Sequence, residues 1–528
     1  MVKNNMDNKK IKIVSIISII ALALTLVAAT YAYFVAQTGE GAQTDIKINA
    51  NTVDTFTFEV GSALNLSLNQ ENFASGKGNQ TGTTFAKAML TANNKTNTAT
   101  EHYYLYLNIS NNTFTYSIDN NTPEILLSIK DGSNNEITTL TGLTYKTVTD
   151  GKGASIKGFD ITNKKGLVTI LNNREITTTS TKTEKWNVTV TFVNYNSNQA
   201  GNAGKSFNAK LMIQKTKIPT LAEYVVSQYT GTQGDNGIYY HNSTLTNGAG
   251  DNSYRYAGAS EIINNFVCFG SAAATCPTDN LYRIVGVFGE NNHGVTGKQL
   301  VKLIKYDYAT SLLLGIDGDY KGSGTPDSTY YKGSLSSVNT YYWNYKATNR
   351  ASNTWSTSLL NKINLNTNYL NNIGTTWSNM IEDVIWKVSG YTTNEVTPST
   401  VYTSEITNAT KTYGPSNGTS KVGLVYASDY GFAASPSAWT KTLANYAGND
   451  ANGTSIKTIN WMYMGYNEWT MTPYSSNSGS VFTLYDSGNL NGDLASNGYG
   501  SRPVMYLKAS VLYAGGSGTK DSPITLVV

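Results

Sequence analysis

The chain has 528 residues, of which 14% are charged, and its formal net charge of +4 is small for that length. At about 150 residues per domain, the length predicts two to four domains with sizeable cores. Lys and Arg form no dense basic stripe, so the sequence offers no nucleic-acid interface. Abundant Asn, Thr, Ser and Gly and 37 tyrosines supply an uncharged polar surface, which favours an extracellular protein over a cytosolic enzyme.

The N-terminus predicts a membrane anchor. A basic cytoplasmic tail at residues 1–12 precedes residues 13–36, which carry no charge. Because about 20 apolar residues span a bilayer as a helix, 13–36 is long enough to cross it. The positive-inside rule leaves the tail in the cytoplasm and the remainder outside the cell. We therefore expect a single-pass cell-membrane protein whose partner is the lipid bilayer. The alternative is a signal peptide cleaved near Thr30-Tyr31-Ala32, which would make the protein secreted.

Residues 40–217 alternate apolar and polar side chains with a period of two. Trp186, Val188, Val190 and Phe192 are typical of this pattern, and half-buried antiparallel strands produce it. Clusters of turn residues separate the segments, so an all-β sandwich of about seven to ten strands is predicted. A helical insertion is expected at 84–92.

The first part of the chain resembles a known group of exported domains. The apolar segment ending in TYAYF, the following DIKINA and the late stretch WNVTVTFVNYNSNQAGNAGKSFNAKLMIQK resemble sandwich domains of Gram-positive bacteria, distantly those of camelysin and biofilm-matrix fibre proteins. Their metallopeptidase association is not carried over, because a zinc site needs several ligands and this domain has one histidine, His102.

A linker helix is expected in 218–234, because IPTLAEYVVSQYTG has a proline boundary and helical spacing of its apolar residues. The remainder, 235–528, predicts an α+β domain. Its strands are expected at LYRIVGVF, KQLVKLIKYD, MIEDVIWKV, VGLVYASDYGF, VFTLYDS, RPVMYLKA and PITLVV, with a short helix over 355–365.

This second part resembles an exported bacterial domain of unassigned function through NLYRIVGVF, KVGLVYASDYGF, EWTMTPYSS and GYGSRPVMYLKASV. Its end is also similar to the C-type-lectin-like fold of formylglycine-generating enzymes and hypervariable display proteins. The catalytic cysteines of those enzymes have no counterpart here. The resemblance therefore implies binding in place of catalysis.

Cys268 and Cys276 lie close together in FVCFGSAAATCPTDN. Outside the membrane this spacing predicts a local disulfide, and the alternative is two unpaired buried thiols.

Two glycine-rich loops offer oxygen ligands for Ca²⁺. One contains Asp317 and Asp319, and the other contains Asp486 and Asp493. Neither loop has EF-hand spacing or a closing bidentate Glu, so plain solvated turns are the alternative. No other cofactor is expected.

The stretch INWMYMGYNEWTM suggests a surface for sugar rings, formed by Trp461, Tyr463, Tyr466 and Trp469. The alternative is that these alternating aromatics pack into the core. Arg502 is a further ligand candidate, and its alternative role is an ion pair with a carboxylate such as Asp486.

No catalytic constellation is present in the sequence. The leading hypothesis is a non-enzymatic, membrane-anchored binding or adhesion protein whose ligand is a glycan, a cell-wall polymer or a protein. The first alternative is a structural subunit that polymerises through its sandwich by strand addition. The second is an extracellular hydrolase that uses carboxylates such as Glu382 and Asp383.

Overall fold

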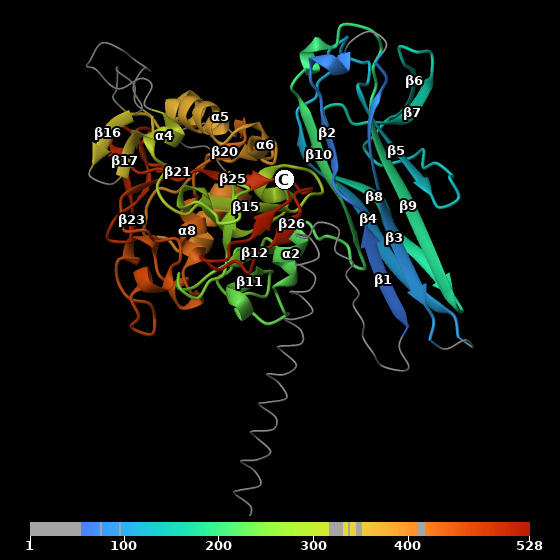
Figure 1. Ribbon diagram of the computed structural model, residues 1–528. Coiled ribbons are helices and arrows are strands. Elements are labelled where there is room, and N and C mark those ends of the chain that lie inside the picture. The colour runs from blue at the N-terminus through green and yellow to red at the C-terminus, as the bar shows by residue number, and fades with distance from the viewer. Residues whose placement is uncertain are drawn as a thin grey trace, which may run out of the picture. The chain divides into compact units, whose positions relative to one another are not determined.

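The computed structural model describes residues 54–73, 77–93, 97–315, 331–335, 338–344, 351–409 and 418–527 (Figure 1). The predicted membrane segment 13–36 and the aspartates Asp317 and Asp319 lie outside these ranges. Over the ranges described, no helix has both the length and the apolar character needed to cross a membrane. The fold has two compact units, of which unit 1 ends at Lys217 and unit 2 runs from Ile218 to Val527.

Unit 1 is a β-sandwich of two antiparallel sheets that share one core, as the period of two predicts. The strands of the six-stranded sheet are, in spatial order, β1 (Thr55–Val60), β3 (Gln80–Thr91), β9 (Thr181–Phe192), β5 (Ile125–Asp131), β7 (Ser155–Asp160) and β6 (Tyr145–Thr149). Those of the four-stranded sheet are β2 (Leu64–Ser67), β10 (Ser206–Gln214), β4 (Ala99–Asn112) and β8 (Gly166–Thr178).

The helix expected at 84–92 is wrong, because β3 occupies this stretch. Ala86, Ala88 and Leu90 are buried and alternate with more exposed residues, which is the strand period. The strand pairs with β1 on one side and with β9 along its whole length on the other. These long-range pairings override the helix propensity of alanine and leucine.

Unit 2 is built on a seven-stranded sheet. Both faces of β14 (Leu281–Phe288) and β15 (Leu300–Lys305) are buried, which explains their nearly continuous apolar sequences. The other strands of this sheet are β11 (Ile238–His241), β12 (Ser253–Tyr256), β13 (Phe266–Cys268), β20 (Val422–Gly423) and β25 (Val504–Leu507).

Smaller sheets complete unit 2. Their strands are β16 (Tyr331–Leu335), β17 (Val338–Tyr342) and β24 (Gly498–Tyr499); β18 (Val384–Trp386) and β19 (Gly418–Ser420); β21 (Glu468–Pro473), β22 (Ser480–Leu484) and β23 (Leu490–Leu494); and β26 (Tyr513–Gly515) and β27 (Thr525–Leu526).

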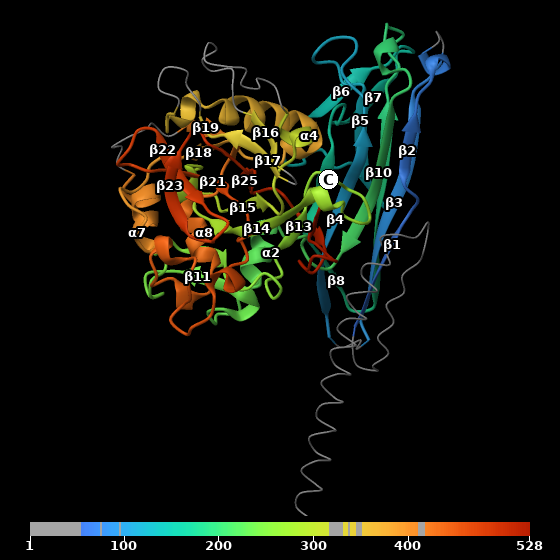
Figure 2. The ribbon, with the colours of Figure 1, turned by 90° about the vertical axis from the view of Figure 1, so that its left-hand side faces the viewer.

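The helices of unit 2 are short and surround the large sheet (Figure 2). They are α2 (Leu221–Ser227), α3 (Glu290–His293), α4 (Ser311–Leu314), α5 (Leu370–Asn372), α6 (Thr375–Ser378), α7 (Pro398–Tyr402) and α8 (Ala427–Ala433), with π-helical turns at Leu360–Tyr369 and Thr403–Thr407. Single 3-10 turns occur in the described residues at Gln70–Phe73, Ala200–Asn202, Asp235–Gly237, Thr278–Asn280, Trp355–Thr357, Pro436–Ala438, Leu443–Asn445 and Ile456–Ile459.

Two of these helices position the features described below. Thr220 and Glu223 form a capping box that starts α2, and α2 packs against β14 and β15 within unit 2.

The predicted strand VGLVYASDYGF is wrong beyond its first residues, because β20 ends at Gly423 and α8 follows. Every residue of α8 is buried, and the helix contacts α7, β12 and β21. Because every side of α8 is buried, its short sequence has no amphipathic period by which it could be distinguished from a strand.

Candidate functional site

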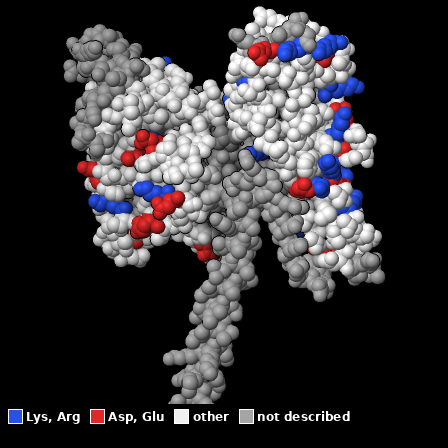
Figure 3. Space-filling view, viewed as in Figure 1, with Lys and Arg blue, Asp and Glu red and all other residues white. Residues whose placement is uncertain are grey.

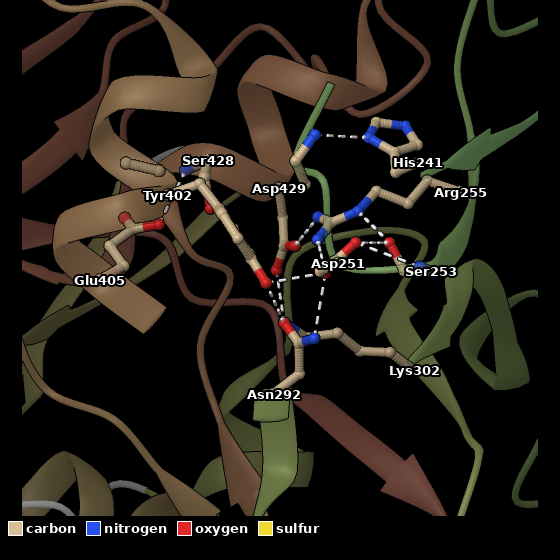
Figure 4. Close-up of polar contacts among 12 residues, drawn as sticks. His241, Asp251, Ser253, Arg255, Asn292, Lys302, Tyr402, Glu405, Ser428 and Asp429 are labelled. Carbon is tan, nitrogen blue, oxygen red and sulfur yellow. Dashed lines mark hydrogen bonds and ion pairs between the residues drawn. The ribbon is translucent and has the colours of Figure 1, made fainter. Parts of the chain in front are cut away.

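The main concentration of charge inside unit 2 is a buried ionic cluster, formed by Asp251, Arg255, Lys302 and Asp429 (Figure 4). Arg255 Nη2 lies 2.8 Å from Asp251 Oδ2, and Arg255 Nη1 lies 3.2 Å from Asp429 Oδ1. Lys302 Nζ contacts Asp429 Oδ2. No side chain of the four is more than 6% exposed. The four residues come from the loop before β12, from β12, from β15 and from α8.

The ionic cluster balances two cations against two carboxylates. Burial of an unpaired charge is costly, so each group depends on its partners. Burial alone would raise the pKa of Asp251, but Arg255, Ser253 and Tyr402 together hold it well below its ordinary value. Burial lowers the pKa of the Lys302 ammonium, and Asp429 opposes this shift.

Neutral donors complete the bonding of Asp251. Its Oδ1 accepts from the hydroxyl of Ser253 at 2.5 Å, and its Oδ2 accepts from Tyr402 at 2.7 Å and from Asn292 at 3.0 Å. Tyr402 also donates to Asn292 at 3.2 Å. This set of bonds fixes Asp251, and through it the orientation of Arg255.

Aromatic rings enclose the cations. Lys302 Nζ lies 4.5 Å from the ring centroid of Tyr426, 5.3 Å from that of Tyr506, 5.4 Å from that of Phe288 and 5.8 Å from that of Trp386. Such contacts stabilise a desolvated cation. Because other side chains cover all four charged groups, the groups within reach of one another are the residues of the ionic cluster themselves.

Glu405 is a further buried carboxyl group beside this cluster. It lies in the π-helical turn Thr403–Thr407, where its Oε2 accepts from the Ser428 backbone N–H at 3.3 Å and its Oε1 accepts from Thr472. Burial raises the pKa of Glu405 to about 7. The group therefore exchanges its proton near neutral pH, unlike an exposed glutamate.

Sequence patterns did not identify this cluster. Its one local signal is a charged residue within an apolar run, such as Lys302 in QLVKLIK and Asp429 in YASDYGF. A buried charge implies a partner, but the partner can lie anywhere in the chain.

The predicted ligand residue Arg502 faces the interior of unit 2. It is 1% exposed, and its Nε donates to Glu468 Oε1 at 2.8 Å. A second donor reaches the Met462 carbonyl at 2.8 Å. The partner is therefore Glu468, a residue of β21, and the alternative partner Asp486 is exposed.

The predicted aromatic surface is divided between the core and the exterior. Trp461 and Trp469 are 1% and 0% exposed, and their indole N–H groups donate to the backbone carbonyls of Tyr256 and Tyr341. Tyr463 and Tyr466 remain partly exposed. The four rings therefore do not share one accessible surface.

In the acidic loop at 486–493, Asp493 is bonded to side chains that flank the loop. Asp493 accepts from Tyr485 at 3.2 Å, from Asn497 at 2.5 Å and from Tyr499, while Asp486 is exposed. Throughout the described ranges, no three or more His, Cys, Asp and Glu side chains group together as a metal site would require. The calcium prediction at Asp317 and Asp319 falls on residues outside those ranges. Glu382 and Asp383 lie just before β18; Glu382 is partly exposed and Asp383 is exposed.

The predicted disulfide is confirmed. Cys268, the last residue of β13, is bonded to Cys276 with a Cα separation of 5.8 Å, which is within the usual range. Cys268 also pairs with Leu281 of β14, so the bond holds the loop at the start of that strand.

A tyrosine cluster that sequence patterns did not identify lies on the edge of the large sheet. Tyr240 of β11 and Tyr254 of β12 are directly opposite each other, with ring centroids 4.6 Å apart and an interplanar angle of 23°. Tyr229 packs against them at 6.0 and 5.6 Å. All three are partly exposed. Two side-chain amides border the rings. The amide of Gln233 bonds the backbone N–H and carbonyl of Tyr240. The amide oxygen of Asn252, an exposed residue, accepts from the Tyr240 hydroxyl.

The sequence matches no protein-family model and no curated protein. The fold and the two clusters therefore carry the functional interpretation.

Proposed function

We propose that this chain is a non-enzymatic, membrane-anchored extracellular protein whose unit 2 binds an uncharged polymer, a glycan of the cell surface or cell wall. The observation that carries the binding role is the tyrosine cluster of Tyr229, Tyr240 and Tyr254. Its partly exposed rings offer flat apolar area to the C–H faces of a sugar, while Asn252 supplies an amide for sugar hydroxyls.

The distribution of charge on the face viewed in Figure 3 favours an uncharged ligand. On the face viewed in Figure 3, charged side chains are sparse and separated by wide uncharged areas. Long-range attraction of an ionic ligand needs a concentrated field of one sign. A neutral saccharide needs only shape, stacking and amide or hydroxyl partners.

Export is supported by the disulfide and by the uncharged segment 13–36. Disulfides persist in oxidising compartments and are rare in the cytosol, so the Cys268–Cys276 bond favours an extracellular unit 2. The segment 13–36 acts as the anchor and leaves residues 1–12 inside. Intact mass of the membrane-extracted protein and protease digestion of whole cells test this part. Loss of the first 30 or so residues from the mature chain would replace the anchor with secretion.

The glycan-binding role is tested with the full chain in detergent on an array of surface and cell-wall glycans. Tyr240→Ala combined with Tyr254→Ala should reduce binding at least about tenfold, since stacking on two rings is lost. The matched control is Tyr104→Ala in unit 1, another partly exposed tyrosine, whose hydroxyl donates to Asn173. Equal binding by both variants, or no glycan bound by the parent chain, rejects the proposal.

We also propose that unit 2 has the C-type-lectin-like arrangement indicated by its sequence, a fold class that often presents ligands on loops and sheet edges. The tyrosine cluster is at such an edge. A crystal structure of the chain with bound glycan would support this position of the site if the sugar lies on Tyr240 and Tyr254, and it would reject this position if the sugar lies elsewhere.

A second candidate function is polymerisation of unit 1 by strand addition. It is favoured by the long strand β8, which is at the edge of the four-stranded sheet and, among the described residues, pairs only with β4. An exposed edge of this length can pair with another chain. Electron microscopy of the concentrated full chain tests it: filaments would support strand addition, and a dispersed monomer rejects it.

A further inference from the structure

We propose that the side chains of Lys302 and Asp429 become joined by an intramolecular amide bond, which the folded protein forms without an added enzyme. The proposal starts from their contact, because Nζ and Oδ2 touch inside a closed compartment. The two residues are 127 positions apart, so the bond would link β15 covalently to α8. It is independent of the binding role proposed above.

Three features of the ionic cluster favour the reaction. Lys302 and Asp429 are held in contact, which replaces an encounter in solution by a fixed geometry. Arg255 Nη1 donates to Asp429 Oδ1 at 3.2 Å, so a guanidinium faces the oxygen that gains negative charge during attack on the carbonyl carbon. The rings of Tyr426 and Phe288 exclude water, which would otherwise compete with the amine and hydrolyse the product.

The reaction balances with water as its sole by-product. The Lys302 ammonium transfers one proton to the Asp429 carboxylate, which gives a neutral amine and a carboxylic acid. The nitrogen then attacks Cγ, the bond from Cγ to Oδ2 breaks, and Oδ2 departs as water with both protons that the nitrogen has lost. Oδ1 becomes the amide oxygen and keeps its bond from Arg255. No oxidant, reductant or cofactor is consumed.

The charges of the compartment favour the product. A buried ammonium and carboxylate each carry a desolvation cost that their attraction only partly offsets. Amide formation removes one charge of each sign and leaves Arg255 paired with Asp251 at 2.8 Å. Burial also lowers the pKa of the Lys302 amine, which increases the fraction of the nucleophilic neutral form.

The deciding experiment is peptide mapping by mass spectrometry of the full chain after reduction of the disulfide. Trypsin should release residues 299–305 joined to residues 422–441, with a mass equal to the sum of the two peptides less one water, because the modified Lys302 resists cleavage. Asp429→Asn should end in the identical linked peptide, since ammonia then leaves in place of water. Lys302→Met should give none. Cleavage after Lys302 and an unlinked 422–441 peptide in the parent chain overturn the proposal, whatever the stability of the variants.

Discussion

Arg255 and Asp429 are 174 positions apart in the chain, yet their side chains meet at 3.2 Å inside unit 2. The contact links β12 to α8 and leaves both groups nearly inaccessible to solvent. The contact makes the ionic cluster a part of unit 2 where stability and protonation depend on the same few side chains.

Arg255→Met should strongly destabilise unit 2. The substitution removes the cation from between Asp251 and Asp429 and leaves an uncompensated buried charge, a change that costs about 3–5 kcal/mol. Urea unfolding followed by tryptophan fluorescence measures the loss, because six of the large fully buried side chains are tryptophans of unit 2.

The matched control for Arg255→Met is Lys87→Met in unit 1. Lys87 and Glu59 form an ion pair of 2.6 Å with 34% and 33% of their side chains exposed, and such pairs contribute at most about 1 kcal/mol. Similar losses in the two variants would show that burial does not decide the strength of these interactions.

Glu405 should make unit 2 less stable as the pH rises from 4.5 to 7. Its pKa is raised from 4.5 to about 7 in the folded protein, so over this range the unfolded chain loses a proton that the folded chain retains. The unfolded state then binds fewer protons, and the free energy of unfolding falls with pH by up to about 1.4 kcal/mol per unit.

The measurement is urea unfolding at several pH values in the parent chain and in Glu405→Gln. The variant should flatten the decline between pH 4.5 and 7. Asp251 acts in the opposite direction: its pKa is held low in the folded state, so its contribution is lost only as the pH falls below the ordinary aspartate range. If the free energy of unfolding declined with equal slope in the parent chain and in Glu405→Gln, the decline would belong to another group.

Replacing Cys268 and Cys276 together by Ser should lower the stability of unit 2. The bonded residues are eight positions apart, and for so short a loop the chain-entropy model allows about 2–3 kcal/mol. Thermal unfolding of the parent chain with and without reductant should show the same shift, and the double variant should not respond to reductant. Free thiols in protein freshly taken from the cell surface would contradict the disulfide bond between Cys268 and Cys276.

Trp469→Ala should affect folding, whereas Tyr463→Ala should not. Trp469 is fully buried and donates to the Tyr341 carbonyl at 2.7 Å, so its truncation leaves a cavity that costs about 3–5 kcal/mol. Tyr463 is partly exposed, and its loss should cost under about 1 kcal/mol. Unfolding midpoints test the difference. A Trp469→Ala chain that folds normally and loses only glycan binding would restore this residue to the ligand surface.

Local sequence determined those features whose physical cause is local. The period of two in Trp186, Val188 and Val190 defines which face of a strand is buried, so the sandwich of unit 1 was predictable. The spacing of Cys268 and Cys276 within one short loop likewise brings two thiols within bonding reach.

Only the tertiary structure decided the features that depend on distant partners. Ala86 and Leu90 lie in a strand because β1 and β9 pair with it, and Trp469 is in the core because of the sheets packed around it. The ionic cluster and the tyrosine cluster are assembled from separate elements. Their formation depends on long-range strand pairing, while a sequence pattern records only the neighbours within a few residues.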